Sequence, residues 1–430
     1  MIKKTAPYCP KAGQPPPQVS SDPCRTHAKL PPAMPKSPLL LLLGLALIGS
    51  APAATKPKPA FQYESGDIRI PIPSADEPLV AQFGARSIEA AAQYLRDGAL
   101  CWVREKNCVN CHTTGPYLAE YPAIHALLRQ QGIVLPQAPH PEIQDDFAQS
   151  VPAKVQPRQE TEKDGHRYVS GSWSAIWRSL GLAQWDRHVS GKLSDLTRRS
   201  LDDMLACQSP HGGYVSYGEV EIPHITTDYE LSVQAARALA SAPDYLKSLS
   251  APAANDAASP NPSNAQRLAS LKAWLKQAKP ANDYDRILAL QLALDFPDCV
   301  SPQQLSQARE LLLSRQHRDG GWCIRDFSSI EAWHYKVSDT VANLIRNLPD
   351  AKSPQSDPYM TGLAVSLLRQ HGSPAQDPAL QRAITWLKSQ QRQSGRWWMH
   401  SLYRGNYHYT TYFATLQALK ALALCQALEL

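Results

Sequence analysis

The chain has 430 residues, of which 43% are hydrophobic and 19% charged, and its formal net charge is +6. The first 53 residues hold six Lys or Arg and one Asp, so the rest of the chain carries 38 basic and 37 acidic residues. A balance this close to neutrality gives no support for a nucleic-acid partner or an anionic membrane surface.

The N-terminal region has the pattern of an export signal. Residues 39–48 read LLLLLGLALI, Lys36 precedes them, and the A-x-A sequence of residues 51–53 follows as a cleavage site. The apolar run is shorter than a membrane span, so residues 34–53 are predicted to be a secretory signal peptide. We therefore expect a periplasmic or secreted protein with no integral membrane segment in its mature part.

The position of the signal peptide decides how we interpret the segments before and after it. The residues before Met34 are rich in Pro, and signal peptides rarely begin with such a segment. Met34 is an alternative start, so residues 1–33 are interpreted as a non-native extension. The mature chain is expected to begin near Ala54, with residues 54–84 as a linker and residues 85–430 as one helical domain.

The first predicted helical hairpin, formed by residues 85–106 and 113–131, has an unusual connection. Cys108, Cys111 and His112 spell C-x-x-C-H, the attachment sequence for c-type haem, in which the thiols bond the haem vinyl groups and the His ligates the iron. Covalent attachment is completed outside the cytoplasm, so this motif agrees with the export signal. Haem c is therefore the predicted cofactor, attached at both cysteines and ligated by His112.

Two other interpretations of the motif stay open. Cys108 and Cys111 form a disulfide, or they are half of a zinc site, although no second C-x-x-C follows. The mature part has seven cysteines, so haem attachment leaves an odd number, five. Four of these five lie in apolar helical contexts, where Cys is usually a small core residue: Cys101, Cys207, Cys299 and Cys425.

Three segments repeat one local plan, an amphipathic helix followed by Gln, a polar turn with Gly, and an aromatic residue. They read LDDMLACQSPHGGY (201–214), ARELLLSRQHRDGGW (308–322) and AITWLKSQQRQSGRW (383–397). A helix rich in small residues follows each of them. Repetition at a roughly constant period predicts stacked units that share one core.

The remaining helices complete the set. Residues 267–278 and 284–296 form a simpler pair, and a weak helix at 141–150 pairs with one at 173–186. This makes six helical hairpins with almost no strand signal. Because the second helices are rich in Ala, Leu and Gly and the first are polar on one face, we expect an all-α fold, an α/α toroid with the second helices inside. The segments expected to be irregular are 132–165, 250–263 and 324–356.

The turns QHRDGGW (316–322) and QQRQSGRW (390–397) resemble the Gln–Trp repeats of squalene–hopene cyclases. The layout of residues 85–428 is similar to that superfamily, which includes prenyltransferases, and to bacterial squalene-cyclase-like proteins that carry C-x-x-C-H ahead of the toroid. The resemblance implies that Gln and Trp in the turns lock neighbouring hairpins. That structural role carries over to Gln316 with Trp322, Gln391 with Trp397 and, more weakly, Gln208 with Tyr214.

The chemistry of the superfamily carries over less well. Squalene–hopene cyclases protonate an alkene with the Asp of a D-x-D-D motif, and the nearest sequences here are DYD (283–285) and DD (202–203). The chain has only six Phe, which is few for stabilising cations. The sequence YHY (407–409) resembles the histidine segment of the prenyltransferase zinc site, but the matching D-x-C is missing. We therefore expect neither squalene cyclisation nor that zinc site, and no catalytic residue is identified.

Tyrosines, often with Asp or His beside them, recur at the starts of the second helices. In a toroid these helices run parallel, so their first turns converge at one mouth, where helix N-termini favour haem propionates or a small anionic or polar substrate. Capping by Asp and packing by Tyr is the alternative account. The pocket candidates are Tyr117, Asp228, Tyr229, Asp283, Tyr284, Asp357, Tyr359 and Tyr409.

The sequence leaves the second haem ligand open. No Met occurs between residues 113 and 193, so the motif does not open a separate small cytochrome domain. The candidates near the mouth are His224, Met360 and His408. His408 is favoured because the last hairpin neighbours the first in a ring, and an open or water-bound iron is the alternative.

Two functions of different class follow. The first is an exported haem protein that acts in electron transfer, with a periplasmic redox partner, or as an oxidoreductase component. The second is a haem-free toroid that binds an isoprenoid or another small ligand, or processes terpenoids, with a Cys108–Cys111 disulfide.

Overall fold

The computed structural model describes residues 60–106, 113–149, 160–163, 166–169, 172–216, 218, 227–249, 262–333, 339–346, 355–400 and 409–428. The chain divides into a unit at 1–56 and a unit at 57–430, and only the second contains described residues. The predicted extension and signal peptide lie outside them.

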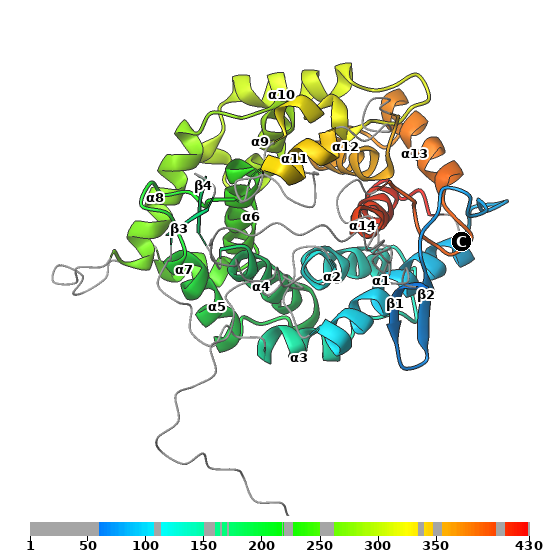
Figure 1. Cartoon of the computed structure of the whole chain (residues 1–430), viewed down its shortest axis with the longest axis horizontal. Coiled ribbons are helices and arrows are strands. Elements are labelled where there is room, and N and C mark those ends of the chain that lie inside the picture. The colour runs from blue at the N-terminus through cyan, green and yellow to red at the C-terminus, as the bar shows by residue number, and fades with distance from the viewer. Residues whose placement is uncertain are drawn as a thin grey trace, which may run out of the picture. The chain divides into compact units, whose positions relative to one another are not determined.

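Six helices form an inner ring. They are α2 (Thr114–Gln130), α4 (Ser172–Trp185), α6 (Asp228–Ala240), α9 (Asp283–Asp295), α12 (Pro358–Gln370) and α14 (Tyr409–Leu424). Each packs against the next in this order, and α14 packs against α2, so the ring is closed (Figure 1).

Six outer helices surround this ring. They are α1 (Ala85–Lys106), α3 (Pro141–Gln149), α5 (Asp195–Ala206), α8 (Asn264–Gln277), α10 (Pro302–Ser314) and α13 (Pro378–Gln390). Most of them contact the inner helix that precedes them along the chain, and α1 contacts α14 in the same way (Figure 1). The chain is thus an all-α α/α toroid of six hairpins, which confirms the predicted fold.

The composition of the helices explains which of them lie inside. In α12 the first eleven residues, from Pro358 to Leu368, are all buried, and Gly362 allows close packing on α14, because a Cβ there would lie 2.5 Å from the Gln417 backbone. In α10 only Ala308 and Leu312 are buried, which is one narrow stripe. A helix packed on most sides needs apolar or small residues all round, whereas an outer helix needs them on one face.

Several shorter elements were not predicted. Two more helices are present: α7 (Pro243–Leu249) follows α6, and α11 (Asp339–Arg346) lies between α10 and α12 in a segment expected to be irregular. In a two-stranded antiparallel pair, β3 (Glu160–Lys163) lies in another such segment and β4 (His166–Val169) directly follows it. One helical turn with π geometry, Asp186–Ser190, extends α4.

Residues 60–84, expected to belong to a linker, are part of the domain instead. Strands β1 (Phe61–Ser65) and β2 (Ile68–Pro71) form an antiparallel hairpin that packs against α1. Tyr63 is only 4% exposed, and its hydroxyl lies 3.2 Å from Thr113 Oγ1 at the start of α2. The linker prediction was wrong for these residues because the strand hairpin packs against the first helical hairpin and buries Tyr63 there.

Three turns at the rim repeat one set of hydrogen bonds. We call them the third turn (208–214), the fifth turn (316–322) and the sixth turn (391–397). In each, the Gln amide nitrogen donates to a Gly carbonyl within the turn and to a backbone carbonyl on the next hairpin. The two carbonyls are those of Gly212 and Arg267 for Gln208, Gly320 and Ala379 for Gln316, and Gly395 and Ser87 for Gln391.

The aromatic residue of each turn is fully buried and anchored to the outer helix before it. Trp322 Nε1 donates to the Leu312 carbonyl and Trp397 Nε1 to the Leu387 carbonyl, both at 2.7 Å. Tyr214 donates to a carbonyl of α5 in the same manner. The structural role predicted for the Gln–Trp pairs is therefore confirmed.

Glycine is required at one position of these turns. Gly395 has a φ of +89°, and a Cβ there would lie 2.2 Å from the Ala90 backbone of α1. Gly212 and Gly320 have similar φ values and approach the next outer helix as closely. The backbone of each turn thus touches the following hairpin, and the sixth turn touches the first.

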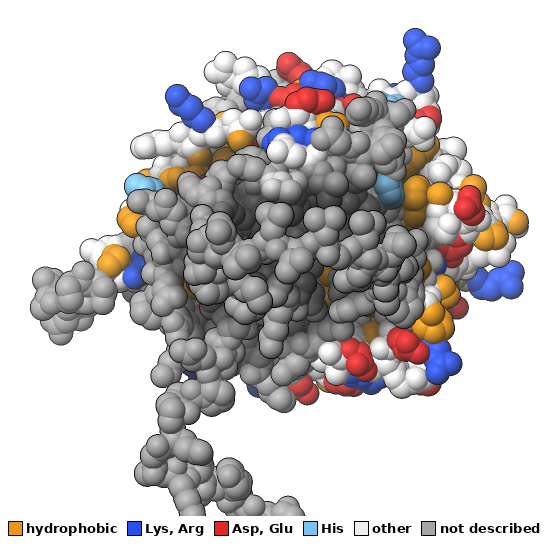
Figure 2. Space-filling model, viewed as in Figure 1, with side chains coloured by type: hydrophobic (Ala, Val, Ile, Leu, Met, Phe, Trp, Pro, Cys, Tyr) orange, Lys and Arg blue, Asp and Glu red, His pale blue; other side chains and the backbone are white. Residues whose placement is uncertain are grey.

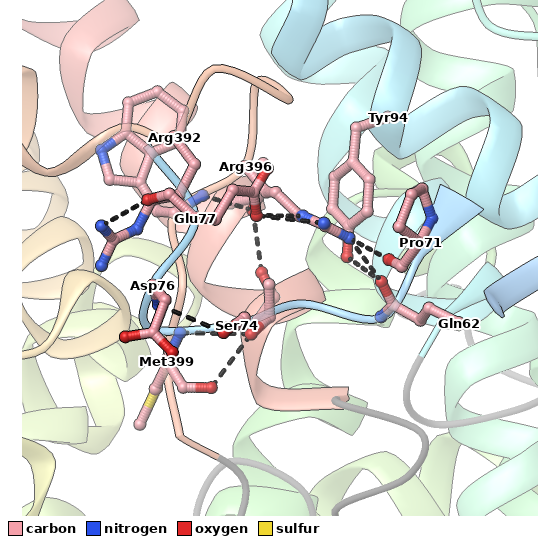
Figure 3. A network of polar contacts seen from close by, with 12 residues as sticks. Gln62, Pro71, Ser74, Asp76, Glu77, Tyr94, Arg392, Arg396 and Met399 are labelled. Atoms are coloured by element: carbon pink, nitrogen blue, oxygen red, sulfur yellow. Dashed lines mark hydrogen bonds and ion pairs between the residues drawn. The ribbon is translucent and has the colours of Figure 1, made fainter. Parts of the chain in front are cut away.

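A buried polar cluster completes this closure (Figure 3). Arg396, 2% exposed, donates to Glu77 Oε2 at 3.1 Å and to the Pro71 carbonyl at 2.5 Å. Its guanidinium also lies over the ring of Tyr94, 5.6 Å from the centroid. The N-terminal segment is thereby tied to the last hairpin, which joins the two ends of the ring.

Within the described ranges, no helix combines the length and the apolar character that crossing a membrane requires. On the face seen in Figure 2, basic and acidic side chains are interspersed around the rim. That mixture matches the near-neutral charge balance outside the N-terminal region.

Candidate functional site

A small cavity lies among five inner helices, α2, α4, α6, α12 and α14. Its apolar wall is aromatic: Trp173 and Trp177 come from α4, Tyr359 from α12 and Phe413 from α14. Its volume is about 30 Å³, which leaves room for no more than a few water molecules. A ligand of terpenoid size does not fit unless wall side chains move.

Phe413 is the centre of the aromatic wall. Its ring meets Trp177 at 6.5 Å between centroids and Tyr359 at 6.2 Å, both edge to face. These arrangements place the positive ring edge against a negative ring face, which stabilises the packing. The three residues stand in the first two turns of their helices, so α4, α12 and α14 begin on the same side of the ring.

Three inner helices, α6, α9 and α12, begin with a side-chain cap. Thr227, Asn282 and Asp357 each accept a hydrogen bond from a backbone N–H in the first turn of α6, α9 and α12. Capping of this kind fixes where a helix begins. The first turns of these three helices lie together, because Tyr284 of α9 contacts Glu230 of α6 and Tyr359 of α12.

A carboxyl and two tyrosines meet at this convergence. The Tyr284 hydroxyl lies 3.1 Å from Glu230 Oε1 and 2.8 Å from the Tyr359 hydroxyl. Burial first, and the Glu230 carboxyl second, raise the pKa of Tyr284 and of Tyr359 well above the ordinary value. Both tyrosines are thus neutral donors held next to a buried carboxyl.

A buried ion cluster forms another part of the site. Glu120 lies 2.6 Å from Arg237 Nη1 and 3.0 Å from Lys420 Nζ. Burial opposes ionisation of Glu120, but the two cations outweigh it and lower the pKa of its carboxyl to about 2. Glu120 is therefore ionised near neutral pH, and the cluster joins α2, α6 and α14 by charge.

Three polar atoms in the cavity wall lack a partner among the described residues. They are Trp177 Nε1, Gln234 Oε1 and Gln417 Oε1. Buried polar groups are normally hydrogen-bonded, so water or a polar part of a ligand is the expected partner. The wall can thus hold a small molecule through an aromatic face and a few directed hydrogen bonds.

The eight pocket candidates do not all gather at this cavity. Tyr359 lines it and Tyr284 is bonded to Tyr359. Tyr229 instead packs on Trp274 of α8, and Asp283 pairs with arginines on the partly exposed outer side.

The other four serve turns and packing. Asp228 accepts from the Ser216 N–H, and Asp357 accepts from the N–H groups of Met360 and Ile324. Tyr117 stacks on Tyr121, and Tyr409 meets Trp102 edge to face. Burial raises the pKa of Asp357 to about 6 in spite of its backbone bonds.

The haem motif itself, Cys108, Cys111 and His112, lies outside the described residues, as do His224 and His408. Its position is still bounded, because the motif falls between the end of α1 at Lys106 and the start of α2 at Thr114. Met360 is fully buried in α12, which packs against α14 and α9. Helix α14, whose first residue directly follows His408, packs against both α1 and α2, as α3 also does.

Sequence reasoning missed the buried charges. Glu120, Arg237 and Lys420 stand singly within apolar stretches of inner helices, which is the signal that marks them, whereas Glu230 follows Asp228 in the first turn of α6. No candidate metal site of three or more His, Cys, Asp or Glu occurs within the described part of the chain. The five cysteines among the described residues, Cys323 included, are buried.

Comparison with known proteins agrees with this architecture. Residues 287–428 match the squalene-hopene cyclase C-terminal domain family. Enfumafungin synthase from Hormonema carpetanum is 28% identical over 138 residues, which are 31% of this chain and 10% of that protein. The chain thus aligns with about a tenth of this relative.

Solved structures with low identity share the general layout. An apo type II terpene cyclase from Scytonema is 14% identical with a TM-score of 0.40, covering 80% of this chain and 97% of the other. A glycosidase variant in complex with glucose is 12% identical with a TM-score of 0.37, covering 80% and 86%. Likeness at this level carries no argument about function.

Proposed function

We propose that this chain is an exported toroid that carries one covalent c-type haem on its first hairpin and acts in electron transfer or as an oxidoreductase component. The observation that carries the proposal is the C-x-x-C-H sequence in the short connection between α1 and α2. Cys108 and Cys111 would hold the group and His112 would ligate its iron. When bound, such a group supplies one-electron transfer or binding of a small gaseous ligand.

The described residues next to this connection are compatible with a buried planar group. Trp102, near the end of α1, meets Tyr409, the first residue of α14, with ring centroids 6.1 Å apart. Thr114 Oγ1, at the start of α2, is buried without a partner among the described residues. An aromatic pair near the end of α1 and an unsatisfied hydroxyl at the start of α2 thus flank the connection in the sequence.

The position of Tyr409 also supports a role for His408. Tyr409, the first residue of α14, contacts Trp102 near the end of α1, and α1 is the helix that precedes the haem motif in the sequence. His408 is our preferred second iron ligand, and an open position is the alternative. A closed position favours electron transfer, whereas an open one favours catalysis or gas binding.

In this proposal the cavity inside the ring is the binding site for a small ligand. Tyr284, Tyr359 and Glu230 form a chain of hydrogen-bonding groups at the converging first turns, and a small polar ligand is the class it would accept. Export through the signal peptide and docking to a periplasmic redox partner belong to the same proposal. Mass spectrometry of protein from its native host tests the export, with a mature N-terminus near Ala54 expected.

A second candidate function is a haem-free toroid that binds or processes an isoprenoid or another small ligand. The aromatic wall around Phe413 and the similarity to squalene-hopene cyclases favour it. In this case Cys108 and Cys111 form a disulfide. The small cavity volume counts against an isoprenoid unless the wall opens.

One experiment separates the two candidates. The protein is expressed together with haem-maturation machinery, denatured, separated on a gel and stained for haem. Covalent haem in the wild type, and its loss in Cys108→Ser/Cys111→Ser, supports the first candidate. His112→Ala should keep at least part of the stain but change the Soret band, and His408→Ala and Met360→Ala test the second ligand. A wild type that never stains under these conditions favours the second candidate.

A further inference from the structure

A serine, a histidine and an aspartate are aligned beside the fifth turn. His317 Nε2 lies 2.6 Å from Asp326 Oδ2, and His317 Nδ1 lies 3.1 Å from Ser356 Oγ. The imidazole thus joins a carboxyl on one side to a hydroxyl on the other. This is the connectivity of a nucleophile, a base and an orienting acid, which is recognised by geometry and not by order along the chain.

The fold holds the three groups from separate segments. Asp326 ends a short 3-10 helix, Ile324–Asp326, whose first N–H is bonded to Asp357 Oδ2. Ser356 directly precedes Asp357, whose own N–H is bonded to the Trp322 carbonyl at 2.8 Å. The cluster is therefore built on the rigid junction between the fifth turn and α12.

Gly321 makes the close approach possible. A Cβ at Gly321 would lie 2.5 Å from Ser356 Cβ. The sixth turn carries Arg396 at the matching position. The missing side chain therefore opens the space that Ser356 occupies.

The turn itself does not need His317. Its backbone N–H donates to the Gly321 carbonyl at 2.9 Å, and the same bond is made by Ser209 in the third turn and Arg392 in the sixth. Three different side chains thus serve one backbone conformation. The imidazole contacts are additional to those that form the turn.

We propose that Ser356 is a nucleophile for acyl transfer from small carboxylic esters, with His317 as its base and Asp326 holding the imidazole. The Ser356 oxygen bonds the ester carbonyl carbon while its proton passes to His317 Nδ1. The alkoxide leaves with that proton, and water then releases the acid by the same path. The side chains of His317 and Asp326 are 31% and 21% exposed, so solvent and a small ester reach the site.

Asp319 competes for the same hydroxyl. Its Oδ1 lies 2.8 Å from Ser356 Oγ, and the hydroxyl has one proton to donate. When the proton points to Asp319, it is turned away from His317, so the carboxyl restrains the nucleophile. Asp319→Asn removes that acceptor charge and leaves the Ser356–His317–Asp326 line in place.

The test is covalent labelling of the folded full chain with a fluorophosphonate, which bonds phosphorus to the serine oxygen and releases fluoride. We expect the label on the Ser356 peptide, none in Ser356→Ala, and a rate at least about tenfold lower in His317→Ala and His317→Gln. Asp326→Asn should also slow the reaction. The control Ser306→Ala, an exposed serine on α10 without a His partner, should label like the wild type.

Several outcomes overturn the proposal. A folded wild type without label on Ser356 does so directly, whatever the variants show. So does a rate that is unchanged in both folded His317 variants, or a fall in Asp319→Asn to the level of His317→Ala, which would make Asp319 the base. Hydrolysis of p-nitrophenyl acetate should follow the same order. The Cys108→Ser/Cys111→Ser protein should label normally, so this result is independent of the haem proposal.

Discussion

The fifth and sixth turns have the same frame but different additions to it. In both, a Gln amide bridges two backbone carbonyls, a Gly touches the next hairpin, and a buried Trp anchors the turn to its helix. The sixth turn adds Arg392 and Arg396, which bind Glu77 and close the ring. The fifth turn adds His317, which contacts Ser356 and Asp326.

This comparison separates the residues that build the turn from the residues that give each turn its own contacts. Positions that are filled alike in both turns build the toroid. Positions that differ have separate roles: Arg396 helps to close the ring in the sixth turn, and His317 joins Ser356 to Asp326 in the fifth. The comparison therefore predicts which substitutions unfold the protein and which leave it folded.

We expect the largest loss of stability when either buried Trp is replaced. Trp322→Ala and Trp397→Ala should each lower the free energy of unfolding by about 3–5 kcal/mol, because each removes a large side chain with no exposed area. Urea unfolding followed by circular dichroism measures it. A variant that keeps the wild-type midpoint yet loses ligand binding would show that the Trp belongs to a site and not to the frame.

Glu120→Gln tests how much the buried ion cluster contributes to the free energy of unfolding, compared with the turns. It leaves Arg237 and Lys420 without their carboxylate, which costs about 3–5 kcal/mol at neutral pH. The folded pKa of about 2 lies below the ordinary 4.5, so the unfolded chain binds the proton first as the pH falls. This stability is full above pH 4.5 and is lost between 4.5 and 2.

Thermal melts across that window show whether Glu120 acts in this way. The wild type should become less stable from pH 4.5 down to pH 2, and Glu120→Gln should show a shallower slope. Equal slopes for the two proteins would show that the ion cluster does not cause the loss of stability at low pH.

Replacing either bridging Gln should lower the stability less than the changes above, and the two losses should differ in size. Gln391 is fully buried, whereas Gln316 is partly exposed. Gln391→Ala should cost about 1–3 kcal/mol, since it leaves two buried carbonyls unsatisfied, and Gln316→Ala should cost less because water reaches its partners. Parallel urea titrations measure both, and a larger cost at Gln316 than at Gln391 would contradict the argument from burial.

The smallest expected effect is at His317. Because the turn is made by backbone bonds and the His317 partners are partly exposed, His317→Ala should change the free energy of unfolding by less than about 1 kcal/mol. A loss as large as that of Trp322→Ala would mean that His317 belongs to the frame, and the comparison of the two turns would fail.

The sequence predicts the fold well because two local signals repeat. Apolar residues at helical spacing mark the inner helices, and Gln, Gly and Trp mark the turns that join the hairpins. The β1–β2 hairpin was missed because its strands are short and follow a Pro-rich segment. Helix α11 was missed because it is a single short helix inside a segment of irregular composition.

The site was harder to predict because closure of the ring creates it. Glu120, Arg237 and Lys420 are distant in sequence and become neighbours only when α2, α6 and α14 meet. Tyr284 and Tyr359 were found through their positions at helix starts, whereas Tyr229 and Asp283 have the same positions and face outward. Helix-start position alone does not give the direction of a side chain. The haem motif stays a prediction from sequence.

The most direct test of the central claim is the intact mass of the denatured protein after export with haem-maturation machinery. We predict a mature chain beginning near Ala54 with the mass of one haem added, and the same chain without that addition in Cys108→Ser/Cys111→Ser. A wild-type mass equal to that of the chain alone, or lower only by the two hydrogens of a disulfide, would contradict the claim.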